Sequence, residues 1–233
     1  MSRMNVSLQG LQKRIGVAFD NEKLLTEALT HRSYLNENPG WETPHNERLE
    51  FLGDAVLELS ATEYLFNCFP EYDEGRLTSI RSALVNHMML SKVAGEIGLN
   101  RHLMMSRGEM RASQRAKEAM LGNAVEALIG AIYLDQGYDA ADNFIDKFIL
   151  VHLGEVMEQK LYDDAKSVLQ ETVQEKLRVT PSYKVLSESG PDHAKTFVVG
   201  VYFNGNLISE GTGCSKQEAE RDAARKALEE MDI

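Results

Sequence analysis

Residues 46–54 read Asn-Glu-Arg-Leu-Glu-Phe-Leu-Gly-Asp, and this stretch carries the densest chemical signal in the sequence. On a helix, Glu47, Glu50 and Asp54 stand at positions i, i+3 and i+7, so the three carboxylates share one face. The two leucines between them occupy neighbouring positions that a protein core can bury. The stretch therefore predicts a helix whose acidic row borders the core.

Two explanations fit this acidic row. A solvated acidic face is the usual one for an average helix. Here, however, an apolar segment follows at residues 55–57, and Gly53 lies inside the helix at a cost of about 1 kcal/mol. Like charges at this spacing destabilise a helix, so a divalent cation that neutralises them is the second explanation. Mg²⁺ prefers carboxylate and water oxygens as ligands.

A second polar pair stands in an otherwise apolar helical segment, residues 119–130. Asn123 and Glu126 are three residues apart in this segment, so they lie on the same face of the helix. A charge in such surroundings is rarely buried without a partner. Either an arginine elsewhere in the chain pairs with Glu126, or both side chains belong to the same cation site as the first acidic row.

Apolar residues recur at helical spacing through most of the first 160 residues. After shorter helical segments near the N-terminus, the pattern predicts helices over residues 46–69, 74–85, 87–95, 116–134 and 140–157. We expect a loop rich in helix breakers at 36–44 and a polar, basic, mobile loop at 105–115. The first domain is therefore predicted to be all-α.

The pattern changes after about residue 160, where residues 165–177 still have helical spacing. Residues with strand propensity then gather in three segments, 182–189, 195–203 and 207–210. Asn204-Gly205 is a strong hairpin turn signal. Ser215 and Glu218 form a capping box at the start of a final helix. These signals predict an α+β unit with the order α-β-β-β-α.

Composition restricts the class of protein. The 233 residues are 43% hydrophobic and 26% charged, which excludes a collagen-like, coiled-coil or mainly disordered chain. No apolar run is long enough to span a bilayer and the start has no signal-peptide pattern, so we expect a cytoplasmic protein with no membrane partner. At face value the net charge of −11 argues against nucleic acid, because phosphate binding usually needs a basic surface.

These motifs resemble the bacterial ribonuclease III family. Residues 46–54 look like its signature, and residues 126–135 resemble its second acidic helix. Residues 77–86 and 107–109 also match its pattern, and the last seventy residues resemble a double-stranded RNA-binding domain. The resemblance covers essentially the whole chain. It implies an all-α endonuclease domain over 1–157, a linker over 158–163 and an α+β double-stranded RNA-binding domain over 164–233.

The resemblance implies roles for individual acidic residues. Glu50, Asp54 and Glu126 match the family's metal-binding and catalytic carboxylates, with Asp54 and Glu126 as the catalytic pair. Glu47 matches a further acid in a supporting role. At the remaining metal-ligand position most members carry Asp, whereas this sequence has Asn123. An amide oxygen coordinates Mg²⁺ without adding negative charge, so metal affinity is expected to fall.

The implied reaction is metal-assisted hydrolysis of double-stranded RNA. The implied cofactor is Mg²⁺, with Mn²⁺ as an alternative, and it activates a water and stabilises the departing 3′ oxygen. Enzymes of this family leave 5′-phosphate and 3′-hydroxyl ends, process ribosomal RNA precursors and other structured transcripts, and act as homodimers. Tyr34, Leu35 and Trp41 are either dimer contacts or ordinary loop packing.

The resemblance also implies an RNA-binding surface. Its positions in this sequence are Gln170, Glu171, His193, Lys216, Arg81 and Arg107. Side chains at the first three positions face minor grooves, where 2′-hydroxyls are read. The lysine reinforces phosphate binding at a helix N-terminus. Gln217 stands where members commonly carry a second basic residue, so we expect a weaker phosphate grip.

Two functional hypotheses from different classes remain. One is a metal-dependent endonuclease of double-stranded RNA, and the other is a double-stranded RNA-binding regulator whose cleavage is weakened or lost through Asn123. A ribosome-associated structural protein ranks last, because such proteins tend to lose the acidic motif. From residue 164 onward nine Lys+Arg and twelve Asp+Glu leave −3, so the first 163 residues carry −8. Neither domain is basic, which predicts a modest, salt-sensitive grip on RNA.

Overall fold

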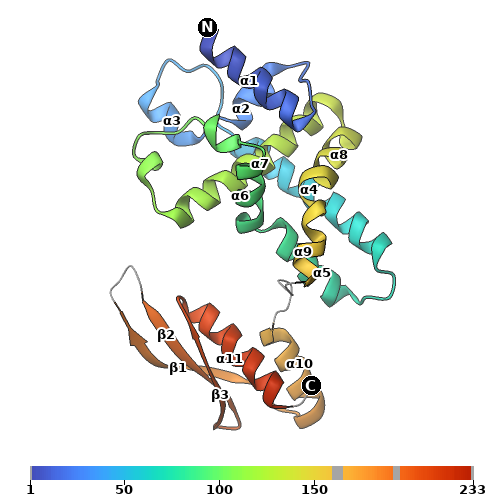
Figure 1. The fold of residues 1–233 in the computed structure, drawn as a ribbon, viewed down its shortest axis with the longest axis vertical. Coiled ribbons are helices and arrows are strands. Elements are labelled where there is room, and N and C mark those ends of the chain that lie inside the picture. Colours follow the sequence, from blue (N-terminus) through green and yellow to red (C-terminus); the bar gives the residue numbers. More distant parts are fainter. Residues whose placement is uncertain (1, 159–164, 191–194, 232–233) are drawn as a thin grey trace. The chain divides into compact units, whose positions relative to one another are not determined.

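Apolar residues at helical spacing let each helix in the first part of the chain bury one stripe, and the result is an all-helical unit (Figure 1). The computed structural model describes residues 2–158, 165–190 and 195–231. The chain divides into two compact units, Met1–Tyr162 and Asp163–Ile233. Each unit has a hydrophobic core of its own.

The first unit consists of helices joined by turns and short loops. Its α-helices are α1 (Ser2–Ile15), α2 (Glu22–Ala28), α3 (Arg32–Glu37), α4 (Glu47–Cys68), α5 (Glu74–Val85), α6 (His87–Glu96), α7 (Gln114–Gln136), α8 (Tyr138–Phe148) and α9 (Leu153–Glu158). Single turns of 3₁₀ helix lie at η1 (Leu99–Arg101), η2 (Glu109–Arg111) and η3 (Leu150–His152). In the part of the chain that the structure describes, no helix is long and apolar enough to span a membrane.

Capping side chains fix where several of these helices begin. Asp73 accepts a hydrogen bond from the amide of Arg76 at 2.8 Å, and Asn86 accepts one from the amide of Met89 at 2.9 Å. Ser113 caps α7 in the same way. Each cap satisfies an amide that the first turn of a helix leaves without a partner. The sequence therefore defines the starts of α5, α6 and α7 locally.

Helices α4 and α7 cross at the centre of the first unit (Figure 1). Glycines at the crossing let the two backbones approach closely. A side-chain carbon at Gly53 would fall 2.8 Å from the amide nitrogen of Gly130 and would overlap the carbonyl oxygen of Glu126. At Gly130 it would overlap the carbonyl oxygen of Leu49. The glycine that weakens α4 in isolation is therefore required for its contact with α7.

The second unit packs two helices on one face of a three-stranded antiparallel sheet (Figure 1). Its elements are α10 (Ala165–Leu177), β1 (Ser182–Ser189), β2 (Thr196–Phe203), β3 (Asn206–Gly213) and α11 (Lys216–Glu230). The core joins Leu169 and Val173 of α10 to Val201 and Phe203 of β2 and to alanines of α11. Alternation along β2 thus directs every second side chain toward the helices.

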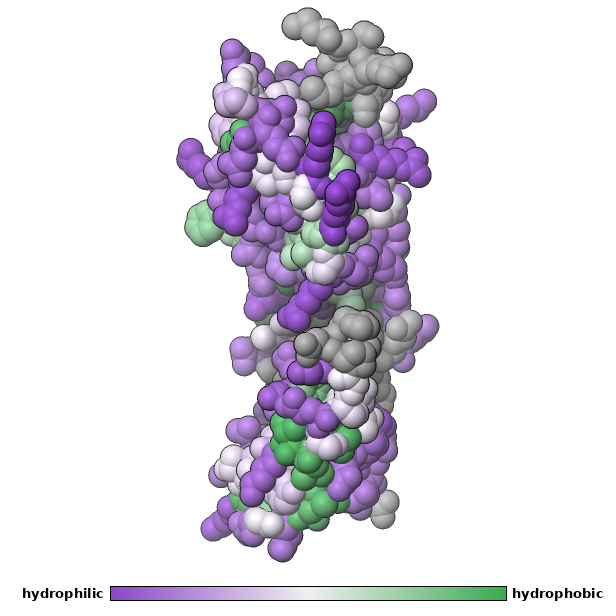
Figure 2. Space-filling model, turned by 90° about the vertical axis from the view of Figure 1, so that its left-hand side faces the viewer, coloured by the Kyte–Doolittle hydropathy of each residue, from purple (hydrophilic) through white to green (hydrophobic). Residues whose placement is uncertain are grey.

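The opposite face of this sheet carries an apolar patch. Leu186 of β1 and Leu207 of β3 are both more than two-fifths exposed. Both approach Gly200 of β2, which leaves room for them in the middle of the sheet. Figure 2 shows the patch in green on the second unit. The hairpin between β2 and β3 turns at Asn204 and Gly205, both with positive φ.

The observed architecture confirms the predicted fold class, an all-α domain followed by an α-β-β-β-α unit. The continuous helix predicted over 140–157 is wrong, because η3 interrupts it between α8 and α9. This turn allows Ile149 and Leu150, which are adjacent in sequence, to be buried together. Strand β3 is longer than the predicted 207–210, and α3 occupies a segment for which no helix was specified.

Candidate active site

The acidic row lies at the N-terminal end of α4, as the helical spacing predicts. Glu50 is half-buried, whereas Glu47 and Asp54 are exposed. Glu47 Oε1 lies 3.4 Å from Arg32 Nη1, and Glu47 Oε2 lies 3.8 Å from His45 Nδ1. The negative charge of Glu47 therefore has a cationic neighbour in Arg32, the first residue of α3.

Glu126 enters the same region from α7. It is only 6% exposed and stands in the apolar middle of that helix. Burial and the nearby carboxylates of Asp54 and Glu50 raise its pKa to about 8. No cationic side chain in the described segments lowers this pKa, so an arginine partner for Glu126 is excluded there.

Glu50 stands where α4, α6 and α7 meet. Burial is the largest cause that raises the pKa of its carboxyl, and the Asn123 side chain, which hydrogen-bonds to it, lowers that pKa. The carboxylates of Glu47 and Asp54 raise the pKa further, and His87 lowers it. The structure thus brings both halves of the predicted acidic site together. It adds His87, the first residue of α6, which no motif in the sequence marks.

The side chain of Asn123 lies beside Glu50. Its Oδ1 atom is buried and has no hydrogen-bond partner. A buried acceptor without a partner costs about 1–3 kcal/mol. A cation bound beside this oxygen would satisfy it and would also neutralise the surrounding carboxylates.

The donor set suits a hard divalent cation such as Mg²⁺, because it consists of carboxylate oxygens and one amide oxygen. In the part of the chain that the structure describes, no three His, Cys, Asp or Glu side chains converge closely enough to hold a metal as they stand. Metal binding at this site would therefore require the side chains to draw together around the ion.

The contacts found for the arginines predicted to bind RNA are with residues outside the acidic cluster. Arg81 of α5 binds Glu58 at 2.8 Å and Thr62 at 2.7 Å, both on α4. The positive charge of Arg81 is therefore already paired with a carboxylate of the first unit. Arg107 is exposed, and its backbone amide donates to both carboxylate oxygens of Glu37 at 3.3 Å.

The segment predicted as a mobile loop, 105–115, is held by hydrogen bonds. Ser33 Oγ accepts a hydrogen bond from the amide of Ser106 at 3.0 Å and lies 2.7 Å from His31 Nδ1. Just before this segment, Met104 pairs with Thr30 in an isolated β-bridge. These contacts fix the backbone that carries Arg107 against α3.

The RNA-binding positions of the second unit lie on exposed parts of its two helices. Gln170 and Glu171 are exposed on α10, and Lys216 is the exposed first residue of α11. The predicted capping box at Ser215 is present, because its Oγ accepts from the amide of Glu218 at 3.2 Å. The predicted contact His193 lies outside the described residues.

Apolar residues suited to a dimer contact lie on α4. Tyr34, Leu35 and Trp41 are half-buried, and the rings of Tyr34 and Trp41 pack edge to face at 5.3 Å, which favours ordinary loop packing. By contrast, three large apolar side chains are exposed along one face of α4. They are Phe51, which is 81% exposed, Leu59, which is 56% exposed, and Phe66, which is 69% exposed. No motif in the sequence marks this stripe, although its spacing is helical.

Comparison with known proteins agrees with both units. The family model described as Ribonuclease-III-like matches residues 21–153, and the one described as Double-stranded RNA binding motif matches residues 165–231. The chain is 46% identical to Ribonuclease 3 of Pelotomaculum thermopropionicum, over 96% of this chain and 92% of that protein. It is 43% identical to Ribonuclease 3 of Desulforamulus reducens, over 100% of this chain and 94% of that protein.

A solved structure supports the assignment of the first unit. The nuclease domain of ribonuclease III from Campylobacter jejuni superposes with a TM-score of 0.56 and 38% identity. The match covers 61% of this chain and 95% of that domain. With both domains matched in this order, the chain belongs to the ribonuclease III family of endoribonucleases.

Proposed function

We propose that this endoribonuclease hydrolyses double-stranded RNA with a divalent cation, Mg²⁺ in the first place and Mn²⁺ as an alternative. The observation that carries the proposal is the buried Glu126, whose carboxyl has no cationic partner in the described chain and faces Glu50 and Asp54. A cluster of this kind is costly without a cation. The free amide oxygen of Asn123 in the same place supports this assignment.

Four side chains would hold the ion: Glu50, Asp54, Asn123 and Glu126. When bound, such an ion generates a hydroxide nucleophile and stabilises charge on the phosphate and the leaving oxygen. Asp54 is the most exposed of these carboxylates, so it would be the one most accessible to RNA. Products with 5′-phosphate and 3′-hydroxyl ends follow from cleavage of the bond to the 3′ oxygen.

Glu126 would couple ion binding to proton release. With a pKa of about 8 it holds a proton at neutral pH in the metal-free protein. A ligand carboxylate must be deprotonated, so the proton leaves as the ion binds. Glu47 would support the site by holding Arg32 beside the first turn of α4, where the arginine offsets negative charge.

We further propose that two copies of the chain act as a homodimer through α4. The side chains of Phe51, Leu59 and Phe66 are all exposed along one face of this helix, and exposed apolar residues that share a face can mark an interaction surface. It lies on the helix that carries Glu50 and Asp54. A two-fold contact along this helix would place two active sites on one duplex, one for each strand.

The second unit would hold the duplex through its A-form shape. Gln170 and Glu171 would reach the 2′-hydroxyls of one minor groove and His193 those of a second. Lys216 would bind phosphate at the N-terminus of α11, where helix amides and the helix dipole also favour an anion. Arg107 is exposed and would add a contact from the first unit, whereas Arg81 must first leave Glu58.

The cellular role that fits this activity is processing of ribosomal RNA precursors and other structured transcripts in the cytoplasm. A regulator that binds duplex RNA without cutting it is the second candidate, and the neutral Asn123 favours it. The three carboxylates around Asn123 favour cleavage, because a pure binder has no use for acids facing a phosphate backbone.

A cleavage assay tests the proposal. Duplex RNA of about 30 base pairs, longer than one binding domain covers, is incubated with Mg²⁺, Mn²⁺ or Ca²⁺ and the parent chain or Asn123→Asp. We expect the parent to cut with Mg²⁺ or Mn²⁺ and the variant to cut faster. If both bind the duplex and neither cuts it, the enzyme hypothesis is wrong. If Glu126→Gln cuts as fast as the parent, the assignment of the site is wrong.

A further inference from the structure

The lysine at the start of α11 is already engaged within its own unit. Lys216 Nζ lies 3.3 Å from Glu188 Oε1 of β1. The same Nζ stands 5.7 Å from the ring centroid of Phe197 of β2, within the range of a cation–π contact. A carboxylate thus already lies within ion-pair distance of the ammonium group that is proposed to bind phosphate.

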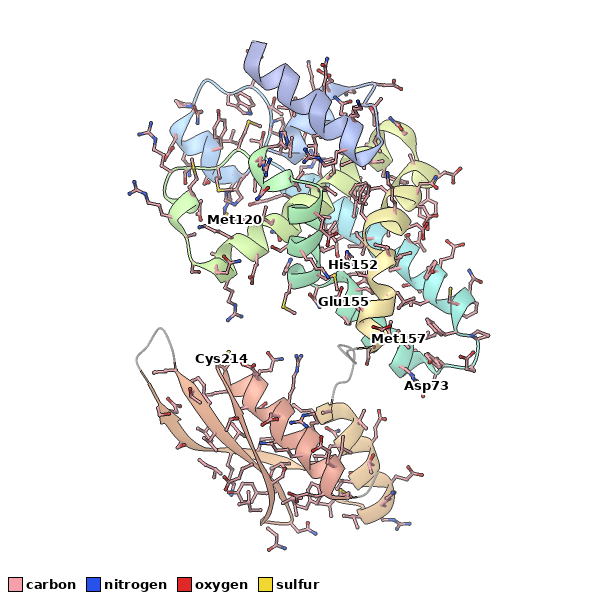
Figure 3. All side chains as sticks on the ribbon, in the orientation of Figure 1. Asp73, Met120, His152, Glu155, Met157 and Cys214 are labelled. Carbon is pink, nitrogen blue, oxygen red and sulfur yellow. The ribbon has the colours of Figure 1, made fainter. Side chains whose placement is uncertain are left out.

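The sheet register explains why these residues meet. Glu188 pairs with Phe197 across β1 and β2, and Phe197 pairs with Gly213 across β2 and β3. Cross-strand partners point to the same face of a sheet. After Gly213 the chain turns through Cys214, which is labelled in Figure 3, and enters α11. Lys216, the first residue of α11, therefore lies at the end of the sheet that carries Glu188.

Other acids near this helix terminus have different partners. Glu218 accepts hydrogen bonds from the amide and the thiol of Cys214, at 2.8 and 2.7 Å. Asp222 accepts from the amide of Thr212 at 2.9 Å and pairs with Arg225 and Lys226. These contacts hold the turn and the helix surface. Glu188 differs from them because its partner is the residue proposed to bind RNA.

We propose that Glu188 competes with RNA phosphate for Lys216 and thereby sets a low affinity of the second unit for duplex RNA. The proposal rests on the proposed phosphate contact of Lys216. To bind RNA, Lys216 must leave Glu188, and the freed carboxylate then stands beside the phosphate backbone. Both effects weaken binding, because the ion pair is lost and a like charge approaches the RNA.

The expected size of the effect follows from the exposure of the pair. The Lys216 and Glu188 side chains are 58% and 41% exposed, so solvent and salt screen their attraction. Exposed pairs are worth little, so removing the carboxylate should tighten RNA binding by about twofold to fivefold. The gain should be largest at low salt and should shrink as ionic strength rises.

The test measures binding of the full chain to a fluorescent RNA duplex of about 30 base pairs, by anisotropy in a metal-free buffer that prevents cleavage. The variants are Glu188→Gln, Lys216→Ala and the double variant, each at several salt concentrations. Glu188→Gln should bind about twofold to fivefold more tightly. In the Lys216→Ala background the same change should not raise RNA affinity, because the ammonium group for which Glu188 and phosphate compete is absent.

A matched control removes one negative charge elsewhere in the second unit. Glu229→Gln breaks an exposed pair with Arg225 on the last turns of α11 and should leave affinity unchanged. If Glu188→Gln gives no gain while Lys216→Ala weakens binding, competition by Glu188 is refuted and the role of Lys216 stands. If Lys216→Ala leaves binding unchanged, the proposed phosphate contact itself fails. If Glu188→Gln raises RNA affinity equally in the parent and in the Lys216→Ala background, the gain comes only from the loss of one negative charge. That result would overturn the proposal.

Discussion

At the scale of single residues, the ionisation of Glu126 links the site to the stability of the fold. Its pKa in the folded metal-free protein is about 8, against an ordinary value of 4.5. The folded state therefore holds a proton that the unfolded state releases between these two values. Stability must fall as pH rises from about 4.5 to about 8 and stay at the lower level above that range.

Glu126→Gln should remove this loss. The amide keeps the shape of the carboxyl and carries no charge, so the metal-free variant should melt several degrees higher than the parent at pH 9 and close to it at pH 4.5. Thermal melts in a chelating buffer across this pH range measure the difference. Glu42→Gln, at an exposed position in the loop before α4, is the control. If the melting temperature of Glu126→Gln depends on pH as strongly as that of the parent, other titrating groups cause the pH dependence.

Asn123→Asp should change stability in opposite directions with and without metal. A fourth carboxylate beside Glu50 adds repulsion, so the metal-free variant should melt at a lower temperature than the parent. Mg²⁺ binds more tightly to a site with more negative ligands, by on the order of tenfold here. The rise in melting temperature per added millimolar Mg²⁺ should therefore be larger in the variant. Equal metal-induced shifts in both proteins would place Asn123 outside the ion's coordination.

At the scale of elements, the crossing of α4 and α7 positions the carboxylates. Gly53→Ala would push a methyl group into the Glu126 carbonyl, so the helices must separate. We expect a loss of at least about 2 kcal/mol in the free energy of unfolding, as overpacked cores show. Urea denaturation measures it. Gly95→Ala in α6 meets open space and should stabilise by about 0.5–1 kcal/mol, so equal effects of the two substitutions would contradict this account.

Local patterns were enough to predict most helices and the acidic row, because period and capping act within a few residues. The structural role of Gly53 was not predictable in this way. Its position inside α4 indicates only that it destabilises the isolated helix. The close packing that it allows depends on Gly130, which lies far along the chain. The same holds for His87 and for the pairing of Glu188 with Lys216, since both arise from tertiary contacts between distant segments. The break at η3 was missed because periodicity alone does not reveal which adjacent apolar residues are buried.

At the scale of the whole molecule, net charge is a poor guide to an RNA partner. The chain carries −11, yet much of its acidity has local partners or lies in the proposed metal site. Glu58 already holds Arg81, and Glu188 holds Lys216. Binding therefore depends on which charges are released toward the duplex rather than on their sum. We therefore expect a modest, salt-sensitive affinity for duplex RNA.

The assembly of two chains offers the last test. Phe51 is 81% exposed, so Phe51→Ala removes little from the fold of one copy. A large aromatic buried in an interface often contributes much of its binding energy, so the loss of Phe51 should raise the dimer dissociation constant by at least about tenfold. Sedimentation equilibrium of the full chain measures this constant. Leu177→Ala is the control, because it truncates a 52% exposed leucine in the second unit. If Phe51→Ala leaves a dimer as stable as the parent while Leu177→Ala weakens it, the interface does not lie along α4. The two chains would then have to pair through another surface of the protein.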